Sequence, residues 1–133
     1  MKTITAHMTK GIHLKTQLVC VDNSGAKILE LIAVKGYHGR YRRLPRAGVG
    51  DVIICSVKKG KETIRGTVVY AVIVRQRQEY RRKEGIHVKF DDNAAVLVNP
   101  KTFDPQGTEI RSVVAKEAVE RFSTIGKIAS VVL

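Results

Sequence analysis

Short apolar runs rich in β-branched residues recur along the first three quarters of the chain, and turns that contain glycine separate them. Runs of this length and composition are typical of β-strands, because branched side chains pack well on a pleated, half-buried surface. The pattern predicts strands over residues 16–21, 27–34, 51–57, 66–75, 86–90 and 94–98. We therefore expect a mostly β protein.

The turns and the most apolar strands indicate how these strands are arranged. Asp22, Asn23 and Gly25 suit a tight turn with positive φ, so the first two strands are expected to form a hairpin. Residues 29–34 and 68–74 are almost continuously apolar, whereas a half-exposed strand would alternate. A small closed barrel with terminal segments packed over its outside would cover both faces and remove exposed sheet edges.

The last quarter of the chain has a different pattern. Residues 115–122 are rich in helix-forming residues and predict a short helix. Ser123 or Thr124 is expected to cap a second helical turn over residues 125–130, although Gly126 weakens this prediction. With 133 residues, the chain is expected to be one domain, 1–133, whose helical segment spans about 115–130.

Charge is the strongest indication of function. Lysine and arginine number 24 against 12 acidic residues, which gives a net charge of +12. A folded polycation attracts polyanions, and nucleic acid is the commonest such partner, ahead of acidic membranes or acidic proteins. A solvated basic surface without a partner is the alternative.

The positive charge is concentrated in a segment without acidic residues, 35–46, which we call the basic loop. Arginine binds phosphate oxygens through its two-pronged guanidinium group, and Tyr37 and Tyr41 are suited to stack on unpaired bases, as in irregular RNA. The RNA-binding residues predicted here are Lys35, His38, Arg40, Tyr41, Arg42, Arg43 and Arg46.

Two further basic clusters are candidate RNA contacts. The weaker one occupies a turn, where lysines are common on any soluble protein, and contains Lys58, Lys59 and Lys61. The other follows the most apolar strand and contains Arg75, Arg77, Tyr80, Arg81, Arg82 and Lys83. Strand alternation is expected to place Arg75 and Arg77 on one face.

The sequence offers no catalytic or metal-binding pattern. Cys20 and Cys55 lie in apolar runs and are expected to be inert core thiols in a reducing, intracellular compartment. The histidines lack metal-ligand spacing, and residues 91–93 fit a hairpin turn better than a cation site. We expect no metal, no cofactor, no enzymatic activity, no secretory signal and no membrane-spanning segment.

Several motifs together resemble the ribosomal protein L14 family. Its signature is matched by residues 71–74, a basic spacer, Gly85, Phe90, Asn93 and residues 96–97, and other family segments are matched by residues 21–26, 47–51 and 115–117. The resemblance covers nearly the whole chain. Residues 75–77 and 80–83 are similar to the archaeal and eukaryotic branch, and the length favours an archaeal member.

The resemblance implies an all-β fold: a small five-stranded closed barrel, OB-like, with a projecting β-ribbon and two short C-terminal helices. It also implies a structural constituent of the large ribosomal subunit, in the cytoplasm, that binds 23S-type rRNA at the subunit interface. Expected partners are ribosomal proteins L3 and L24e, small-subunit rRNA through intersubunit bridges, and a subunit anti-association factor.

The family's C-terminal region faces the small subunit, and the charges here are of mixed sign, as expected of a protein-facing surface. The residues predicted to face a protein or the small subunit are Thr108, Glu109, Arg111, Lys116, Glu117, Glu120 and Arg121. Val119 and Phe122 are expected to pack on the barrel, which would leave Glu117 and its charged neighbours accessible.

Two alternative functions remain open from the sequence. A free OB-like module that binds single-stranded nucleic acid would share the barrel and the charge, but it needs aromatic residues on a sheet face. An enzyme acting on RNA would need an acid–base pair near the basic loop, and the sequence offers none.

Overall fold

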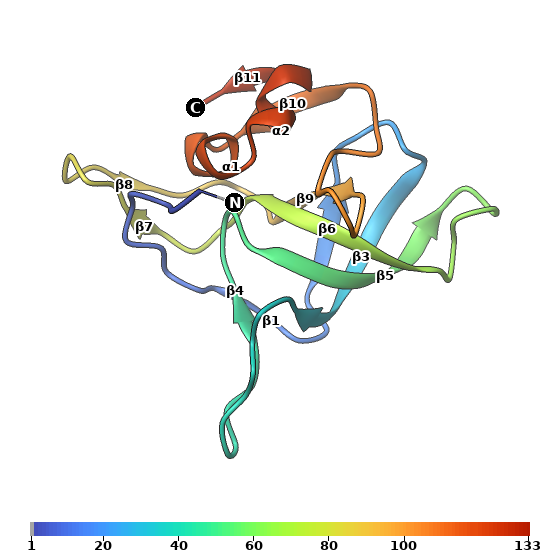
Figure 1. Cartoon of the computed structure of the whole chain (residues 1–133), viewed down its shortest axis with the longest axis horizontal. Coiled ribbons are helices and arrows are strands. Elements are labelled where there is room, and N and C mark those ends of the chain that lie inside the picture. The colour runs from blue at the N-terminus through green and yellow to red at the C-terminus, as the bar shows by residue number, and fades with distance from the viewer. Residues whose placement is uncertain (1) are drawn as a thin grey trace.

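Five strands close into a small barrel in the computed structural model, which describes residues 2–133 (Figure 1). They are β2 (Gln17–Cys20), β3 (Ala26–Val34), β5 (Val52–Gly60), β6 (Val68–Arg75) and β9 (Ala94–Val98), in the order β2-β3-β5-β6-β9. Neighbouring strands are antiparallel, except that β2 and β9 close the barrel as a parallel pair. The expected all-β barrel is confirmed.

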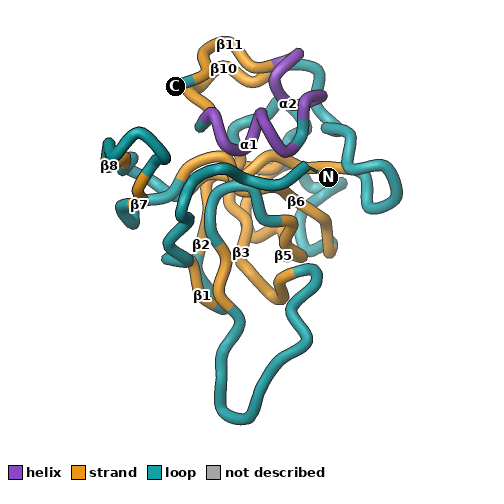
Figure 2. Tube along the Cα trace, turned by 60° about the vertical axis from the view of Figure 1, so that its left-hand side comes forward, coloured by secondary structure: helices purple, strands orange, loops and turns teal. Residues whose placement is uncertain are grey.

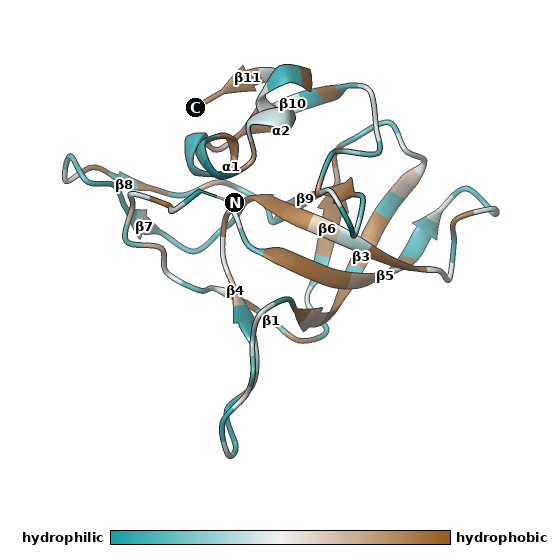
Figure 3. Ribbon diagram, in the orientation of Figure 1, coloured by the Kyte–Doolittle hydropathy of each residue, from teal (hydrophilic) through white to brown (hydrophobic). Residues whose placement is uncertain are grey.

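Burial on both faces, expected of the most apolar strands, occurs in only part of the barrel. All of β9 is buried, and so is β6 from Ala71 onward, because C-terminal segments cover the outer surface there. The backbone N–H of Ala115 donates to the carbonyl of Val74 over 3.0 Å. In contrast, Ile32 of β3 is 46% exposed, so the expectation of a covered β3 is wrong at that end. Figure 3 shows the apolar residues concentrated in the barrel strands.

The turn between β2 and β3 has the geometry that its sequence predicts. Gly25 has φ +105°, a conformation that favours glycine. The carboxylate of Asp22 accepts hydrogen bonds from the N–H of Ser24 at 3.2 Å and from the N–H of Leu97 at 2.9 Å. Asp22 therefore stabilises the hairpin and also joins it to β9.

Three two-stranded pairings lie outside the barrel. β1 (Ile12–His13) pairs with β4 (Arg46–Ala47), and β7 (Tyr80–Arg81) pairs with β8 (His87–Val88). The third pairing is parallel, between β10 (Ile110–Val114) and β11 (Ala129–Val132). We call β7, β8 and the turn between them the basic ribbon; it projects from the barrel (Figures 1 and 2).

The strand predicted over residues 86–90 is shorter than expected. Only His87 and Val88 pair with another strand, whereas Ile86 is 60% exposed and the N–H of Phe90 donates to the carbonyl of Gln76. The ribbon is thus held by two residue pairs and by contacts to the rest of the molecule.

Two short helices follow β10: α1 (Lys116–Arg121) and α2 (Ser123–Ile128). The first matches the prediction. The second begins earlier than predicted, its N-cap residue is Phe122 rather than Ser123 or Thr124, and Ser130 belongs to β11. A Cβ atom on Gly126 would lie 2.6 Å from Cγ1 of Val119, so glycine allows α1 and α2 to approach closely. No helix within residues 2–133 is long and apolar enough to cross a membrane.

Candidate nucleic-acid interface

The basic loop extends away from the barrel between β3 and β4 (Figures 1 and 2). Gly36 and Gly39 have positive φ, which allows the chain to turn. At the tip, the N–H of Arg43 donates to the carbonyl of Arg40 over 3.0 Å, and the Tyr37 hydroxyl donates to the carbonyl of Arg43 over 3.0 Å. These hydrogen bonds give the tip a defined conformation.

The arginine side chains of the basic loop are free to bind a ligand. Arg40, Arg42, Arg43 and Arg46 are exposed, and none forms an ion pair with another of residues 2–133. Tyr41 is 86% exposed, and the guanidinium carbon of Arg42 lies 5.2 Å from its ring centroid. Exposed arginines without acidic partners, beside an exposed aromatic ring, are suited to bind phosphates and stack on bases.

His38 and Lys35, also predicted to bind RNA, differ in whether their side chains make contacts within the chain. The side chain of His38 is exposed to solvent. The ammonium group of Lys35 lies 4.0 Å from the ring centroid of Phe103, so this lysine already makes a cation–π contact within the chain. Lys35 remains exposed, but its orientation is set by Phe103.

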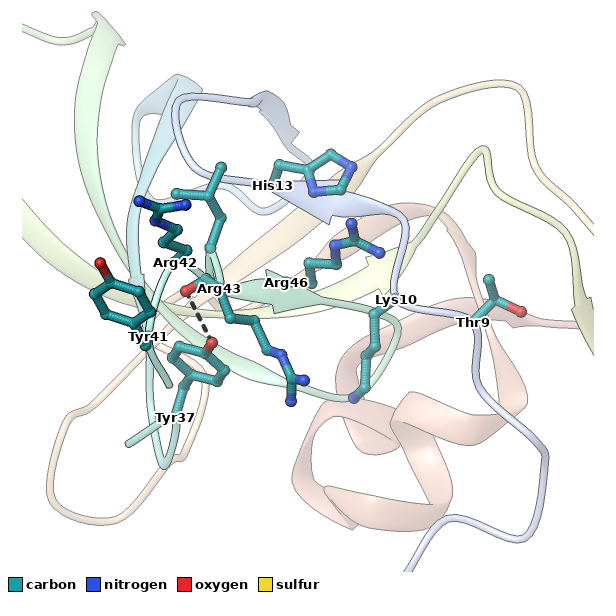
Figure 4. Close-up of a pocket in the computed structure, with 9 residues that line it drawn as sticks. Thr9, Lys10, His13, Tyr37, Tyr41, Arg42, Arg43 and Arg46 are labelled. Atoms are coloured by element: carbon teal, nitrogen blue, oxygen red, sulfur yellow. Dashed lines mark hydrogen bonds between the residues drawn. The ribbon is translucent and has the colours of Figure 1, made fainter. Parts of the chain in front are cut away.

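An open groove of about 980 Å³ lies between the basic loop and the N-terminal segment (Figure 4). Its lining residues are Thr9, Lys10, His13, Tyr37, Tyr41, Arg42, Arg43, Leu44 and Arg46. In Figure 4, Arg43 reaches from the loop toward Lys10 of the N-terminal segment. Thr9, Lys10 and His13 were not predicted from the sequence. They reach the loop only because β1 pairs with β4, a contact that the sequence does not reveal.

The basic residues of the cluster over residues 75–83 differ in exposure: some are buried and paired, and others are exposed. Arg75 is 9% exposed; its Nε and Nη2 donate to the Asp92 carboxylate at 2.9 and 3.0 Å, and its Nη1 donates to the carbonyl of Val113 at 2.9 Å. The expectation that Arg75 and Arg77 share a face is wrong, because β6 ends at Arg75, Gln76 is fully buried, and only Arg77 is exposed. Arg75 is a structural residue, and Asp92 is its partner.

Tyr80 is also structural, contrary to its predicted role as an RNA contact. Its side chain is 1% exposed, and its hydroxyl donates to Oε2 of Glu117 over 2.7 Å. Burial and the Glu117 carboxylate raise the pKa of Tyr80, so the phenol stays protonated. A ring buried in this way cannot stack on a base.

Glu117 is the centre of this buried cluster. Nε of Arg82 donates to its Oε1 over 2.7 Å, and this contact raises the pKa of Arg82. The expectation that Glu117 is accessible to a partner is wrong, because the residue is 2% exposed. Arg81 and Lys83 of the ribbon remain exposed.

The lysine cluster lies at another part of the surface. Lys58 and Lys59 lie in the last part of β5, which ends at Gly60, and Lys61 follows in the turn; all three are exposed. Nζ of Lys58 lies 3.7 Å from Oε1 of Glu30, so part of this charge is neutralised. In Figure 1 this turn and the basic ribbon lie at opposite ends of the molecule, so one compact ligand cannot contact both.

The C-terminal surface has the mixed charge that its sequence predicts. Glu109 and Arg111 form an exposed ion pair of 3.2 Å, and Lys116 lies 3.8 Å from Glu120. The N–H of Thr108 donates to Oδ1 of Asn23 over 2.8 Å, which fixes the position of this turn.

Arg121, also predicted to face a partner, is partly buried and forms an ion pair within the chain. Its Nη1 lies 3.4 Å from the Asp51 carboxylate, and its side chain is 25% exposed. Asp51 also accepts from Lys10 at 2.5 Å and from the N–H of Gly48 at 2.8 Å. Arg121 therefore joins α1 to the turn before β5.

The two thiols have the surroundings of core residues. Cys20 donates to Oδ1 of Asp22 over 3.1 Å, and Cys55 is fully buried. Burial raises the pKa of each thiol to about 12. Residues 2–133 contain no cluster of three or more histidine, cysteine or acidic side chains that could hold a metal ion.

Comparison with known proteins identifies the family of this chain. The model of the family described as "Ribosomal protein L14p/L23e" matches residues 11–133. Two relatives named "Large ribosomal subunit protein uL14", from Thermoplasma volcanium and Thermoplasma acidophilum, are 50% and 49% identical over the full length of both chains. A third protein of the same name, from Methanocella arvoryzae, is 46% identical, again over the full length of both chains. The chain therefore belongs to the L14p/L23e family of ribosomal proteins, which confirms the family expected from its motifs and the ribosomal location that this family implies.

Proposed function

We propose that this ribosomal protein is a structural constituent of the large subunit that binds large-subunit rRNA mainly through the basic loop, and that it catalyses no reaction. The observation that carries the proposal is the set of four exposed arginines, Arg40, Arg42, Arg43 and Arg46, without acidic partners in residues 2–133. The names of the full-length relatives support the assignment to the large subunit.

The basic ribbon supplies a second rRNA contact in this proposal. Arg81 and Lys83 of the ribbon are exposed, and so is Arg77, which precedes it in the chain. Arg82 of the ribbon is occupied by Glu117, and Arg75 of β6 by Asp92. Contacts to phosphates determine how a protein sits on RNA, and two separate basic projections would fix its orientation better than one. The lysine cluster, Lys58, Lys59 and Lys61, is a weaker third contact, because lysine binds phosphate as a point charge.

The C-terminal surface is proposed to face protein and the small subunit. Thr108, Glu109, Arg111 and Lys116 are exposed and Glu120 is half-buried; together they form a surface of mixed sign, which favours protein partners over a polyanion. The family resemblance suggests ribosomal proteins L3 and L24e, the intersubunit bridges and a subunit anti-association factor as its partners. Glu117 is excluded from this surface by its burial.

The free single-strand-binding module is less well supported. Such modules use an aromatic platform on a sheet face. In the barrel strands of the described chain, Tyr70 is the one aromatic residue, and it is half-buried. The most exposed ring, that of Tyr41, lies in the basic loop instead.

Binding to isolated large-subunit rRNA tests the proposal. The variant R40A/R42A/R43A should bind at least about tenfold more weakly, since each arginine contact to a charged phosphate contributes about 1.5–3 kcal/mol. Its thermal unfolding should be unchanged, because these side chains are exposed. The matched control is K58A/K59A/K61A, which removes the same charge. An equal loss in both variants would refute the primary role of the loop.

A further inference from the structure

The N-terminal arm, residues 2–11, links the two basic projections, and its residues 2–10 lie outside the family match. The family model begins at residue 11, whereas the archaeal relatives align with the whole chain. Near the middle of the arm, the N–H of His7 donates to the carbonyl of Arg81 in the basic ribbon over 3.1 Å. At its C-terminal end, the arm continues into β1, where His13 pairs with Arg46 at the base of the basic loop. Figure 2 shows the arm descending from below α1 to β1.

The arm is attached firmly enough to act as a fixed surface. The side chain of Gln76, itself fully buried, donates from Nε2 to the carbonyl of Thr9 over 2.9 Å. Thr5 donates to Glu120 over 3.3 Å, and Lys10 is paired with Asp51. The arm is therefore held along its length and not only at its ends.

Three grooves follow one another along the arm and share lining residues. The groove of about 980 Å³ at the basic loop and a second groove of about 460 Å³ share Thr9. This second groove and a third, of about 160 Å³, share His7 and Arg81. The series begins at Arg42 and Arg43 of the loop and ends at Arg82 and Lys83 of the ribbon.

The chemistry along these grooves suits a sugar–phosphate backbone. His7 and His13 are exposed, and an imidazole has an N–H donor in either protonation state. The acidic residues beside the path have partners of their own: Glu120 contacts Thr5 and Lys116, and Glu117 pairs with Arg82. Oε1 of Glu79 lies 2.6 Å from Nδ1 of His87, and Asp51 is paired with Lys10 and Arg121. These acidic side chains are paired with basic groups, whereas the arginines of the basic loop have no acidic partner among residues 2–133.

We propose that the N-terminal arm forms the floor of a continuous path for one strand of rRNA, which runs from the basic loop to the basic ribbon. His7, Thr9 and His13 contact its backbone between the two arginine-rich ends. This proposal rests on the proposed rRNA binding and adds the route of the strand. Because the path is open and has cationic side chains at both ends, a nucleic-acid strand fits it better than an apolar peptide.

Photo-cross-linking in assembled large subunits tests the route. A benzophenone amino acid is placed at Thr9, at Arg43, at Arg81 and, as a matched control, at Thr63, which is exposed on the turn after β5. The expected result is that Thr9 cross-links to nucleotides that lie in one strand between those reached from Arg43 and Arg81, whereas Thr63 does not reach this strand. Cross-links from Thr9 to protein only, or to a separate strand, would overturn the proposal.

Binding of isolated rRNA separates the two hypotheses. The variant H7A/H13A removes only exposed side chains, and its rRNA affinity should fall about tenfold while its thermal unfolding stays unchanged. If R40A/R42A/R43A weakens binding but H7A/H13A does not, the path along the arm is wrong and the proposed function stands. If neither variant weakens binding, the proposed function itself fails.

Discussion

At the scale of single residues, Glu117 is the one acidic side chain within residues 2–133 that is buried. Its two carboxylate oxygens accept from the Tyr80 hydroxyl and from Arg82, and it joins α1 to the basic ribbon. A buried carboxylate is stable only when it is paired, so each of the three residues depends on the other two.

Removal of this carboxylate should destabilise the fold. We expect Glu117→Ala to lower the free energy of unfolding by about 3–5 kcal/mol, because Arg82 and Tyr80 would lose a buried charged partner. Tyr80→Phe should cost about 1.5–3 kcal/mol, the value of one hydrogen bond to a charged group. Chemical denaturation measures both. The control is Glu120→Ala, which removes a carboxylate that is 33% exposed and should cost less than about 1 kcal/mol; an equal cost for Glu117→Ala would contradict the buried-cluster account.

The thiols give a second prediction at this scale. Burial raises the pKa of Cys20 and Cys55 from the ordinary value of 9.0 to about 12. Both should therefore resist alkylation in the native protein at pH 8 to 9 and react rapidly once it is unfolded. Because the folded state holds these protons more tightly, their contribution to stability is present below pH 9 and is lost as pH rises toward 12. Mass spectrometry after timed alkylation measures the reaction; fast native labelling of Cys55 would show that the barrel opens locally.

At the scale of elements, the five barrel strands could be predicted because each is a local run of branched apolar residues. The two-residue strands β1, β4 and β7 could not, since they exist only through their partners, and β8 was predicted only as part of a longer strand over residues 86–90. The parallel pair β10 and β11 also escaped prediction, because residues 129–132 gain a strand partner only after α1 and α2 reverse the chain.

For the candidate site too, features set by local sequence could be predicted and features set by distant partners could not. The basic loop was evident from composition, because a run of arginine without acids needs no tertiary information. Arg75 and Tyr80 were misassigned since their partners, Asp92 and Glu117, lie 17 and 37 residues further along the chain. The contribution of Thr9 and His13 to the groove depends on the pairing of β1 with β4, which sequence spacing does not reveal.

The C-terminal surface gives a prediction at this scale. Glu120→Lys should leave incorporation into the large subunit intact, because this side chain makes only partly exposed contacts with Lys116 and Thr5. It should alter the rate of subunit joining or the binding of an anti-association factor, since it reverses charge on the proposed protein-facing surface. Sedimentation measures incorporation, and light scattering on mixing with small subunits measures joining.

The control for this experiment is Glu62→Lys, which makes the same change at an exposed residue of the turn after β5. Unchanged joining in both variants would show that the C-terminal surface has no such role. Failure of Glu120→Lys to enter the large subunit would instead make α1 part of the assembly interface.

At the scale of the whole molecule, the net charge of +12 should make rRNA binding strongly dependent on salt. Each neutralised phosphate contributes about 0.7–0.9 to the slope of log affinity against log salt. Loss of three phosphate contacts in R40A/R42A/R43A should therefore reduce the slope by about 2–3. Filter binding over a series of salt concentrations measures it. A flat response in the unaltered protein would mean that its charge has another use.

Sedimentation of ribosomes on sucrose gradients tests the central claim most directly. The protein, tagged and expressed at its natural level, should migrate with large subunits and whole ribosomes, and washes of increasing salt should release it only at high concentration. The variant R40A/R42A/R43A should be released at lower salt than K58A/K59A/K61A. A major pool of the unaltered protein in ribosome-free fractions at low salt would contradict the account.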